Sequence, residues 1–283
     1  MSAVLQLRPD PAPAAAPAPA PRRATKFAPG THITIEGLRK SFAGAPVYDG
    51  FDLGLPRGEL VSVFGPNGCG KSTLINMMAG ILPHEGGQIL FDGKEVKDTR
   101  IGYVFQNYRE ALFPWKRALD NILYPLKFLP GLTRAEGLRR VEALVEAFDV
   151  QVDLKRYPYE LSGGQQQLVS IMRALVVEPE VLFMDEPFSA LDYELTLLMR
   201  ERLQKVLHER RVTTLLVSHD LEEAIYLADK VLLLTRRPTT IADFVDVRLP
   251  RPRRAEMLTE PDFIALKKHC LAVFQACTGR SLA

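Results

Sequence analysis

Residues 65–73, GPNGCGKST, combine glycines, a lysine and hydroxyl groups in the spacing of a phosphate-binding loop. The stretch fits G-x-x-x-x-G-K-[ST], and its glycines let backbone N–H groups turn toward an anion. Lys71 would reach the β- and γ-phosphates of a nucleotide, and the Ser72 hydroxyl would bind Mg²⁺. An apolar strand before the loop and a helix after it argue against a chance match. The nucleotide-binding candidates here are Gly65, Pro66, Asn67, Gly68, Cys69, Gly70, Lys71, Ser72 and Thr73.

Two carboxylates follow the apolar run VLFM, at Asp185 and Glu186. At the end of a buried strand, Asp185 is placed to hold Mg²⁺, and Glu186 is placed to polarise an attacking water. An apolar run followed by Asp-Glu is also common at ordinary strand ends, so this motif is weak by itself. Together with the phosphate-binding loop it indicates nucleotide hydrolysis.

Two further polar residues end apolar runs of the same kind. His219 ends TTLLVSH, and Gln106 ends IGYVFQ. Ligands of open α/β sheets gather at the carboxyl ends of the strands, so we expect both side chains near the γ-phosphate. A lone histidine at a strand end is otherwise usually a surface residue. The catalytic candidates are therefore Glu186, His219 and Gln106, and the metal-binding candidates are Ser72, Gln106 and Asp185.

The elements that must position these residues alternate between strands and helices. Apolar strand patterns occur in GELVSVF, RIGYVFQ, VLFMDEP, TTLLVSHD and KVLLLTR, and helical patterns occur between several of them. Such alternation predicts a mainly parallel sheet with helices on its faces. HITIEGL, FDLGL and QILFDG have few helices between them and predict an antiparallel patch joined to that core.

LSGGQQQ, residues 161–167, has two glycines, one hydroxyl and three amides, but no carboxylate, lysine or metal ligand. Its backbone N–H groups and its serine could contact an anion, although they could not hold that anion alone. The helical pattern of the residues that follow places this loop at a helix N-terminus, which favours negative charge.

The composition limits the class of protein. The chain has 283 residues and a formal charge of +2, which gives no argument for nucleic acid or an anionic membrane surface. Three cysteines cannot make a disulfide framework, and no apolar run approaches the roughly 20 residues that span a bilayer. We expect a soluble intracellular protein.

Changes in composition predict the domain boundaries. Residues 1–30 include an Ala/Pro-rich stretch without core-forming side chains, and we expect a disordered tail there. We expect the folded domain to span residues 31–250. Residues 251–283 read as a basic, proline-broken connector and an amphipathic terminal helix.

The motifs GPNGCGKST, VFQ, LSGGQQQ, VLFMDEP, SALD and SHD occur in the order and approximate spacing of a nucleotide-binding subunit of ATP-binding cassette (ABC) transporters. The chain resembles that family from about residue 32 to residue 250, and LSGGQ separates it from GTPases, kinases and helicases. The resemblance implies an α/β P-loop cassette with a mainly parallel sheet core, an antiparallel β patch and a helical subdomain, about 107–175, that carries LSGGQ.

The resemblance also gives LSGGQ a role. Two subunits are expected to face each other head to tail, so that this motif covers the γ-phosphate held by the other subunit. ATP, with Mg²⁺, would then be part of the interface, and SALD would line the same interface. Phe42 stands where the family stacks an aromatic ring on adenine, and Val47 matches a further apolar contact. The residues implied in this way are Ser162, Gly163, Gly164, Gln165, Phe42 and Val47.

The partners are implied by the same resemblance. A free-standing ATPase of this length resembles the bacterial importers. The stretches EALFPWKRALDNI and LLLTRRPTTIADFVDVRLPRPR are most similar to the nitrate, sulfonate, taurine and bicarbonate group. A separate permease would contact the segment around Phe113 and Trp115, although these side chains could equally pack the loop onto its own helices. A solute-binding protein would complete the system at the cytoplasmic face of the inner membrane. The transported solute is not encoded in this chain.

Three alternatives stay open. The chain could serve an exporter, and import and export cannot be separated from it alone. An ABC ATPase acting on DNA or ribosomes usually has two cassettes or an inserted coiled coil, whereas this sequence has one phosphate-binding loop, one LSGGQ and no sustained heptads. A regulatory binder without hydrolysis is disfavoured by Glu186 and His219.

Overall fold

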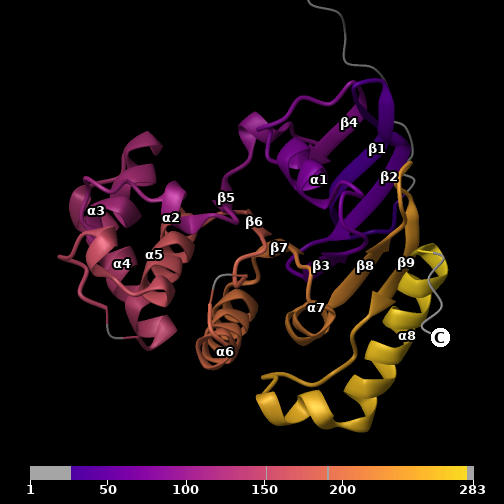
Figure 1. Ribbon diagram of the computed structural model, residues 1–283. Coiled ribbons are helices and arrows are strands. Elements are labelled where there is room, and N and C mark those ends of the chain that lie inside the picture. The colour runs from indigo at the N-terminus through magenta and orange to yellow at the C-terminus, as the bar shows by residue number, and fades with distance from the viewer. Residues whose placement is uncertain (1–26, 151, 190, 279–283) are drawn as a thin grey trace, which may run out of the picture.

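Two sheets form the centre of the molecule in the computed structural model, which describes residues 27–150, 152–189 and 191–278 (Figure 1). The larger sheet has six strands in the order β5-β6-β7-β3-β8-β9, and the smaller has three in the order β2-β1-β4. The strands are β1 (Thr31–Phe42), β2 (Ala45–Pro56), β3 (Leu60–Phe64), β4 (Gly86–Phe91), β5 (Ile101–Val104), β6 (Val181–Asp185), β7 (Thr213–Val217), β8 (Lys230–Leu234) and β9 (Ile241–Asp246).

The strands of the larger sheet are apolar runs because helices or the smaller sheet cover both of its faces. All five residues of β3, β6 and β7 are buried, and these strands pair in parallel. Alternate residues of β6 enter different cores. Phe183 packs with α1 and the smaller sheet, whereas Met184 packs with the helices of the opposite face. The predicted fold class, a mainly parallel core with an antiparallel patch, is confirmed.

The helices cover the larger sheet and extend to one side of it. They are α1 (Lys71–Met78), α2 (Tyr108–Ala111), α3 (Ala118–Leu123), α4 (Arg134–Phe148), α5 (Gly163–Leu175), α6 (Tyr193–Arg210), α7 (Leu221–Leu227) and α8 (Pro261–Thr278), with short 3-10 turns at Val96–Asp98, Tyr124–Phe128, Pro158–Glu160 and Ala255–Thr259. Helices α2 to α5, residues 108–175, lie together beside β5 and β6, and we call them the helical lobe (Figure 1). The lobe contains the LSGGQ residues.

Some elements differ from their sequence patterns. The helical pattern after the phosphate-binding loop extends to Leu82, but α1 ends at Met78 because Gly80 adopts a positive φ of +71°. Neither α7 nor β9 was predicted from the sequence. Strand β9 is the edge strand of the sheet and its residues are only partly buried, which leaves no continuous apolar run to recognise.

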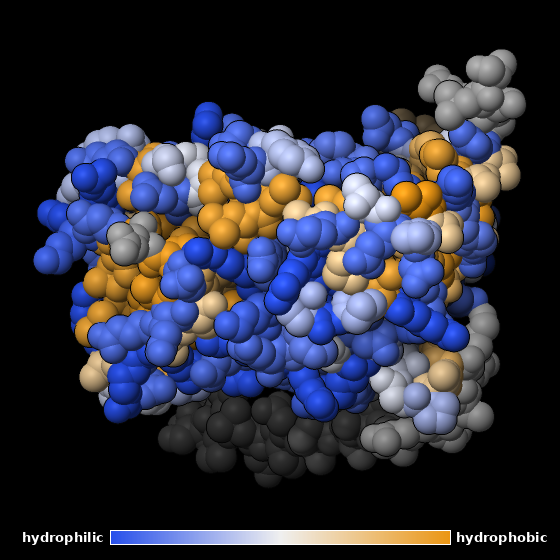
Figure 2. Space-filling model, turned by 90° about the horizontal axis from the view of Figure 1, so that it is seen from below, coloured by the Kyte–Doolittle hydropathy of each residue, from blue (hydrophilic) through white to orange (hydrophobic). Residues whose placement is uncertain are grey.

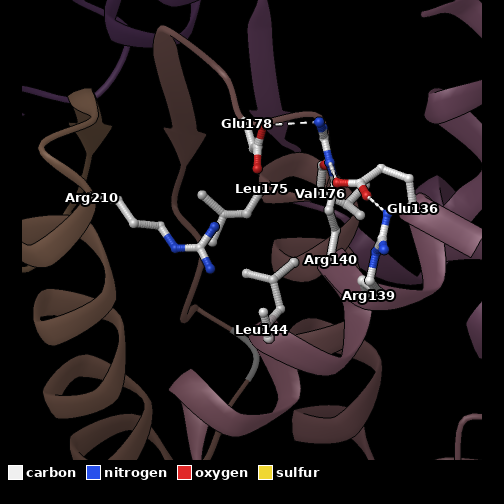
Figure 3. A pocket seen from close by; sticks show the side chains of 9 residues that line it. Glu136, Arg139, Arg140, Leu144, Leu175, Val176, Glu178 and Arg210 are labelled. Atoms are coloured by element: carbon white, nitrogen blue, oxygen red, sulfur yellow. Dashed lines mark hydrogen bonds and ion pairs between the residues drawn. The ribbon is translucent and has the colours of Figure 1, made fainter. Parts of the chain in front are cut away.

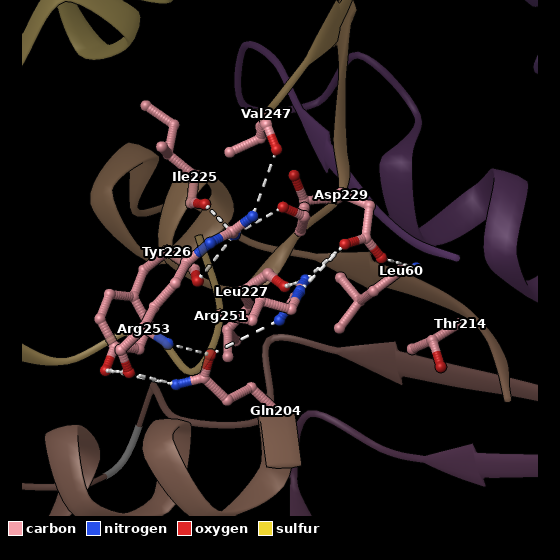
Figure 4. A network of polar contacts seen from close by, with 12 residues as sticks. Leu60, Gln204, Thr214, Ile225, Tyr226, Leu227, Asp229, Val247, Arg251 and Arg253 are labelled. Atoms are coloured by element: carbon pink, nitrogen blue, oxygen red, sulfur yellow. Dashed lines mark hydrogen bonds and ion pairs between the residues drawn. The ribbon is translucent and has the colours of Figure 1, made fainter. Parts of the chain in front are cut away.

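One arginine of the basic segment after β9 is packed into the protein. Arg253 is 1% exposed, and its guanidinium donates to the carbonyl of Val247 at 3.3 Å (Figure 4). It also donates to three carbonyls at the C-terminal end of α7, those of Ile225, Tyr226 and Ala228. A cation is favourable at that end of a helix because the carbonyl groups there lack partners. The segment expected as a connector thus anchors α8 to α7.

The surface seen from below Figure 1 is mainly hydrophilic, with hydrophobic side chains at the left, over the helical lobe, and further groups near the centre and at the right (Figure 2). None of the helices in the described parts of the chain is long and apolar enough to cross a membrane. Most of the expected N-terminal tail, residues 1–26, lies outside the described residues, as does Ala190 of SALD. Phe27, the first described residue, lies against Gly54 of β2.

A buried histidine joins the smaller sheet to the larger one. His32 of β1 is 1% exposed, and its Nδ1 lies 2.6 Å from the hydroxyl of Thr213 in β7. That hydroxyl accepts a hydrogen bond from the N–H of Gly58, so it can donate to His32. Burial, followed by the charge of Arg57, lowers the pKa of His32 to about 4. The imidazole is therefore neutral at pH 7.

We expect this histidine to make the protein less stable in acid. The pKa of His32 rises from about 4 in the folded chain to 6.5 when the chain unfolds, so stability is complete above pH 6.5 and falls as the pH is lowered. Between pH 7 and pH 5, the free energy of unfolding should fall by about 2 kcal/mol more in the native chain than in His32→Gln. Urea unfolding at the two pH values measures the free energy of unfolding of both proteins. An equal decrease between pH 7 and pH 5 in the native chain and in His32→Gln would contradict this prediction.

Candidate functional site

The phosphate-binding loop connects β3 to α1 and surrounds one ammonium group. Lys71 is 7% exposed, and its Nζ donates to the carbonyls of Gly65 at 2.9 Å and Pro66 at 3.2 Å. Gly70 precedes α1 with φ at +116°, a conformation that residues with a side chain rarely adopt. The loop thus places a lysine charge and the N-terminal end of α1 at one point, as an anionic ligand requires.

Residues from other parts of the chain support this loop. The Tyr48 hydroxyl donates to the carbonyl of Gly70 at 3.0 Å, and the Thr239 hydroxyl donates to the carbonyl of Cys69. A Cβ on Gly70 would lie 2.6 Å from Val47 Cγ1, so Val47 packs against the loop from beneath. Val47 is fully buried. The structure thus shows Val47 supporting the loop, and its expected contact with a base stays a prediction.

Phe42, the other candidate for contact with a base, lies on the surface. It ends β1 and is 43% exposed, and the Lys40 ammonium lies 5.3 Å from the centre of its ring. One face of a half-exposed ring can take part in stacking. Of the two sequence-predicted contacts to a base, Phe42 is the one with an exposed side chain, and its stacking on adenine stays a prediction.

A hydroxyl and a carboxylate meet where α1 faces the end of β6. The Ser72 hydroxyl donates to Asp185 Oδ1 at 3.2 Å. Asp185 is 6% exposed, and burial raises its pKa, against the effects of the Ser72 hydrogen bond and the Lys71 charge. No group of three His, Cys, Asp or Glu residues that could hold a metal ion occurs among the described residues. One hydroxyl and one carboxylate still fit Mg²⁺, which keeps several waters and takes other ligands from phosphates.

The three catalytic candidates converge on one carboxylate. Glu186 Oε2 accepts a hydrogen bond from Gln106 Nε2 at 2.8 Å and lies 3.2 Å from His219 Nδ1. The three residues follow β5, β6 and β7, which are neighbours in the sheet, so strand order alone brings them together. Their carboxylate, amide and imidazole can orient a water and receive its proton.

The backbone of Glu186 is held in an uncommon conformation. Its φ is +46°, in the left-handed region that residues with a side chain seldom occupy. Its N–H donates to the carbonyl of Val217 at 2.9 Å, which ties the residue to the neighbouring strand β7. Strained backbone of this kind is often found at functional sites, where the surroundings hold a side chain in a fixed direction.

The LSGGQ residues form the N-terminal end of α5. Ser162 caps the helix: its hydroxyl accepts from the N–H of Gln165 at 3.3 Å, and the Gln165 side chain accepts from the N–H of Ser162 at 3.1 Å. As an acceptor in the cap, the serine oxygen keeps its own hydrogen free to donate. The loop therefore offers one O–H group together with the positive end of a helix.

Side chains of two other segments approach both glycines of this loop closely. A Cβ on Gly163 would lie 2.9 Å from the Tyr108 hydroxyl, and one on Gly164 would lie 2.1 Å from Leu195 Cδ2. Tyr108 follows Gln106 by two residues, and Leu195 lies in the first turn of α6, after SALD. Tyr108 and Leu195, like Tyr48 and Thr239, could not be predicted as part of the site, because no sequence motif marks them.

A hollow of about 260 Å³ lies elsewhere, where α4 and the end of α5 meet the end of α6 (Figure 3). Arg140 there pairs with Glu178 at 3.0 Å, and Arg210 points into the space beside Leu175. The described lining contains none of the candidate residues, so we place the functional site at the strand ends rather than here.

Comparisons with known proteins agree with this geometry. Residues 48–189 match the family described as ABC transporter. The sulfate/thiosulfate import ATP-binding protein CysA of Neisseria meningitidis serogroup A is 38% identical over 241 residues, which cover 81% of this chain and 67% of the relative. The taurine import ATP-binding protein TauB of Escherichia coli O157:H7 is 35% identical over 247 residues, covering 85% of this chain and 96% of the relative.

A solved structure extends the comparison to three dimensions. The dimeric post-hydrolysis state of the ATP-binding cassette MJ0796, bound to ADP and Pi, superposes with a TM-score of 0.67 at 25% identity, over 77% of this chain and all of that one. The matched family, the identity to the two relatives and the shared architecture lead to one conclusion. The chain belongs to the ABC transporter family, as one of its ATP-binding ATPases.

Proposed function

We propose that this chain hydrolyses ATP to energise a membrane importer of a small anion, such as sulfate, a sulfonate, taurine, nitrate or bicarbonate. The observation that carries the proposal is the contact of Gln106 and His219 with the Glu186 carboxylate, at the sheet edge that also holds the phosphate-binding loop. The class of solute is supported by CysA and TauB, which are named as importers of sulfate/thiosulfate and of taurine.

Each site residue has a role in this proposal. Lys71 and the N–H groups of residues 65–73 bind the phosphates, and Phe42 stacks on the adenine. Ser72, Asp185 and the amide oxygen of Gln106 hold Mg²⁺, which would neutralise charge on the phosphates. Glu186 receives the proton of the attacking water, and His219 and Gln106 keep its carboxylate in place.

The LSGGQ loop acts on a second copy of the subunit, or on a close relative. Two such chains face each other head to tail, and the free O–H of Ser162 and the N–H groups of Gly163 and Gly164 contact the γ-phosphate held by the other chain. The capped helix end supports this role, because it presents donors but no cation of its own. The dimeric form of the MJ0796 cassette is further support.

A groove of about 340 Å³ beside the helical lobe is the proposed contact with the permease. Its lining includes Phe105, Phe113, Tyr124 and Phe128, with Arg173 at 5.8 Å from the Phe113 ring. Trp115, outside the lining, is 71% exposed, and its ring centre lies 5.6 Å from that of Phe113. Aromatic side chains around an apolar groove are suitable anchors for a helix. The subunit would lie on the cytoplasmic face of the inner membrane, with a solute-binding protein on the other side.

Transport by the reconstituted system tests this proposal. With its permease and solute-binding protein in vesicles, the chain should drive uptake of the small anion only with ATP and Mg²⁺. Phe113→Ala should keep the ATPase rate of the isolated chain within about twofold and reduce uptake by tenfold or more, because the groove loses an anchor. Ile264→Ala, on exposed α8, is the control. ATP hydrolysis without uptake of any such anion would contradict the function, and full uptake by Phe113→Ala would contradict the contact.

A further inference from the structure

The loop that carries His219 is held by a network of polar groups, of which Ser218 and Glu223 are buried. The hydroxyl of Ser218 hydrogen-bonds to the carboxylate of Glu223 and accepts from the N–H of Asp220 at 3.0 Å. The N–H of Ser218 donates to the carbonyl of Val63 in β3. Both neighbours of His219 are therefore fixed, while the imidazole itself is 54% exposed and free to face Glu186.

An arginine of another helix closes this network. Arg200 lies in α6 and is 7% exposed, and its Nη2 is 3.0 Å from Asp220 Oδ2. Its Nε lies 3.8 Å from Glu223 Oε1. Glu223 is 3% exposed, and burial raises its pKa whereas the Arg200 charge lowers it. The two buried charges depend on each other, because either one alone would be left without a counter-charge.

The partners of Arg200 lie immediately beside the catalytic candidate. Asp220 follows His219 in the chain, and Glu223 lies in the first turn of α7, whose N-cap is Asp220. Helix α6 itself begins directly after SALD, and its Leu195 packs against Gly164 of LSGGQ. One rigid helix therefore reaches from the proposed subunit interface to the loop of His219.

We propose that Arg200 is a positioning residue that acts through Asp220 and Glu223 to hold His219 against the Glu186 carboxylate. This inference rests on the proposed function, in which His219 supports hydrolysis. Stability alone does not explain why two charges are buried here, because apolar side chains of similar size often stabilise a fold equally well. The position of the Arg200–Glu223 pair beside His219 explains it instead by an effect on catalysis.

The test is steady-state ATP hydrolysis by the full chain with Mg²⁺. Arg200→Met should lower kcat by about tenfold or more and leave KM for ATP within about twofold, because a misplaced catalytic group affects turnover more than binding. Arg202→Met is the matched control. Arg202 lies on the same helix but donates to the carbonyls of Phe148 and Asp149 at the C-terminal end of α4, away from His219. The kcat of Arg202→Met should therefore stay within about twofold of the native value.

A second measurement separates positioning from a general loss of structure. In a His219→Ala background, Arg200→Met should lower kcat by less than about twofold further, because coupled residues are not additive. The pair Arg200→Met with Glu223→Met removes both buried charges. We expect it to recover the unfolding temperature lost in Arg200→Met, while its kcat stays about tenfold below the native value.

Each result decides a separate point. An Arg200→Met variant as active as Arg202→Met, or fully additive with His219→Ala, would overturn the positioning role. Native kcat together with recovered stability in the double variant Arg200→Met/Glu223→Met would also overturn the positioning role. A His219→Ala variant with native kcat would overturn the proposed role of His219, and this inference with it. A low kcat in His219→Ala together with a native kcat in Arg200→Met would overturn the positioning role of Arg200 and leave the proposed function standing.

Discussion

We expect Glu186→Gln to bind ATP as the native chain does and to hydrolyse it at least about 100-fold more slowly. The amide has the size of the carboxylate and can still accept a hydrogen bond from Gln106, but it cannot take the proton of an attacking water. ATP would then stay bound between two subunits, and the closed dimer should accumulate. Binding of a fluorescent ATP analogue, phosphate release and gel filtration with ATP and Mg²⁺ measure the three effects.

The control for this substitution is Glu142→Gln, which changes an exposed carboxylate of α4 in the same way. It should hydrolyse ATP at the native rate. Native turnover by Glu186→Gln would show that another group receives the proton. A slow variant that remains monomeric with ATP and Mg²⁺, at high protein concentration, would instead speak against the head-to-tail dimer.

Lys71→Ala should reduce the affinity for ATP by about 10- to 100-fold and abolish measurable turnover. The reason is the loss of the ammonium at the centre of the loop, where charge-assisted hydrogen bonds contribute about 1.5–3 kcal/mol each. Lys205→Ala, on the exposed side of α6, removes the same charge elsewhere and should bind ATP normally. Isothermal titration measures both affinities, and native turnover by Lys71→Ala would contradict the phosphate assignment.

The same variant can report whether each site is built from two chains. Ser162→Arg should bind ATP but place a large cation where the other subunit must dock, so it should be inactive alone. A mixed dimer with Lys71→Ala combines one intact phosphate-binding loop with one intact LSGGQ from the other chain. Recovery of part of the ATPase activity on mixing supports sites shared between subunits. A Ser162→Arg variant that hydrolyses ATP at the native rate would contradict them.

The candidate site was largely predictable because most of its chemistry lies in contiguous residues. Gly70 must be glycine where its φ is +116°, and Lys71 and Ser72 follow it in the same loop, so one short pattern records the arrangement. Glu186 and His219 were predictable for a related reason: each follows a buried apolar run, and parallel strands end at one edge of a sheet. The distances among these side chains, and the positive φ of Glu186, could not be predicted.

The contacts that join distant parts of the chain escaped prediction. The packing of Val47 against Gly70 was not foreseen, and the supporting hydroxyls of Tyr48 and Thr239 were missed. Thr239 lies 170 residues from Cys69, whose carbonyl it contacts. No local pattern links residues so far apart, because the contact exists only after the strands between them have paired.

The amino-acid sequence by itself determined the family, the phosphate-binding loop and the order of strands and helices, since these depend on local residue types and on hydrophobic periodicity. The tertiary structure alone decided which groups share an environment. It brought Gln106 to Glu186 across 80 residues and buried Arg200 against Glu223. The physical reason is that hydrogen bonds and buried charges depend on the distance between atoms and on exclusion of water, and only the packed sheet and helices set those two quantities.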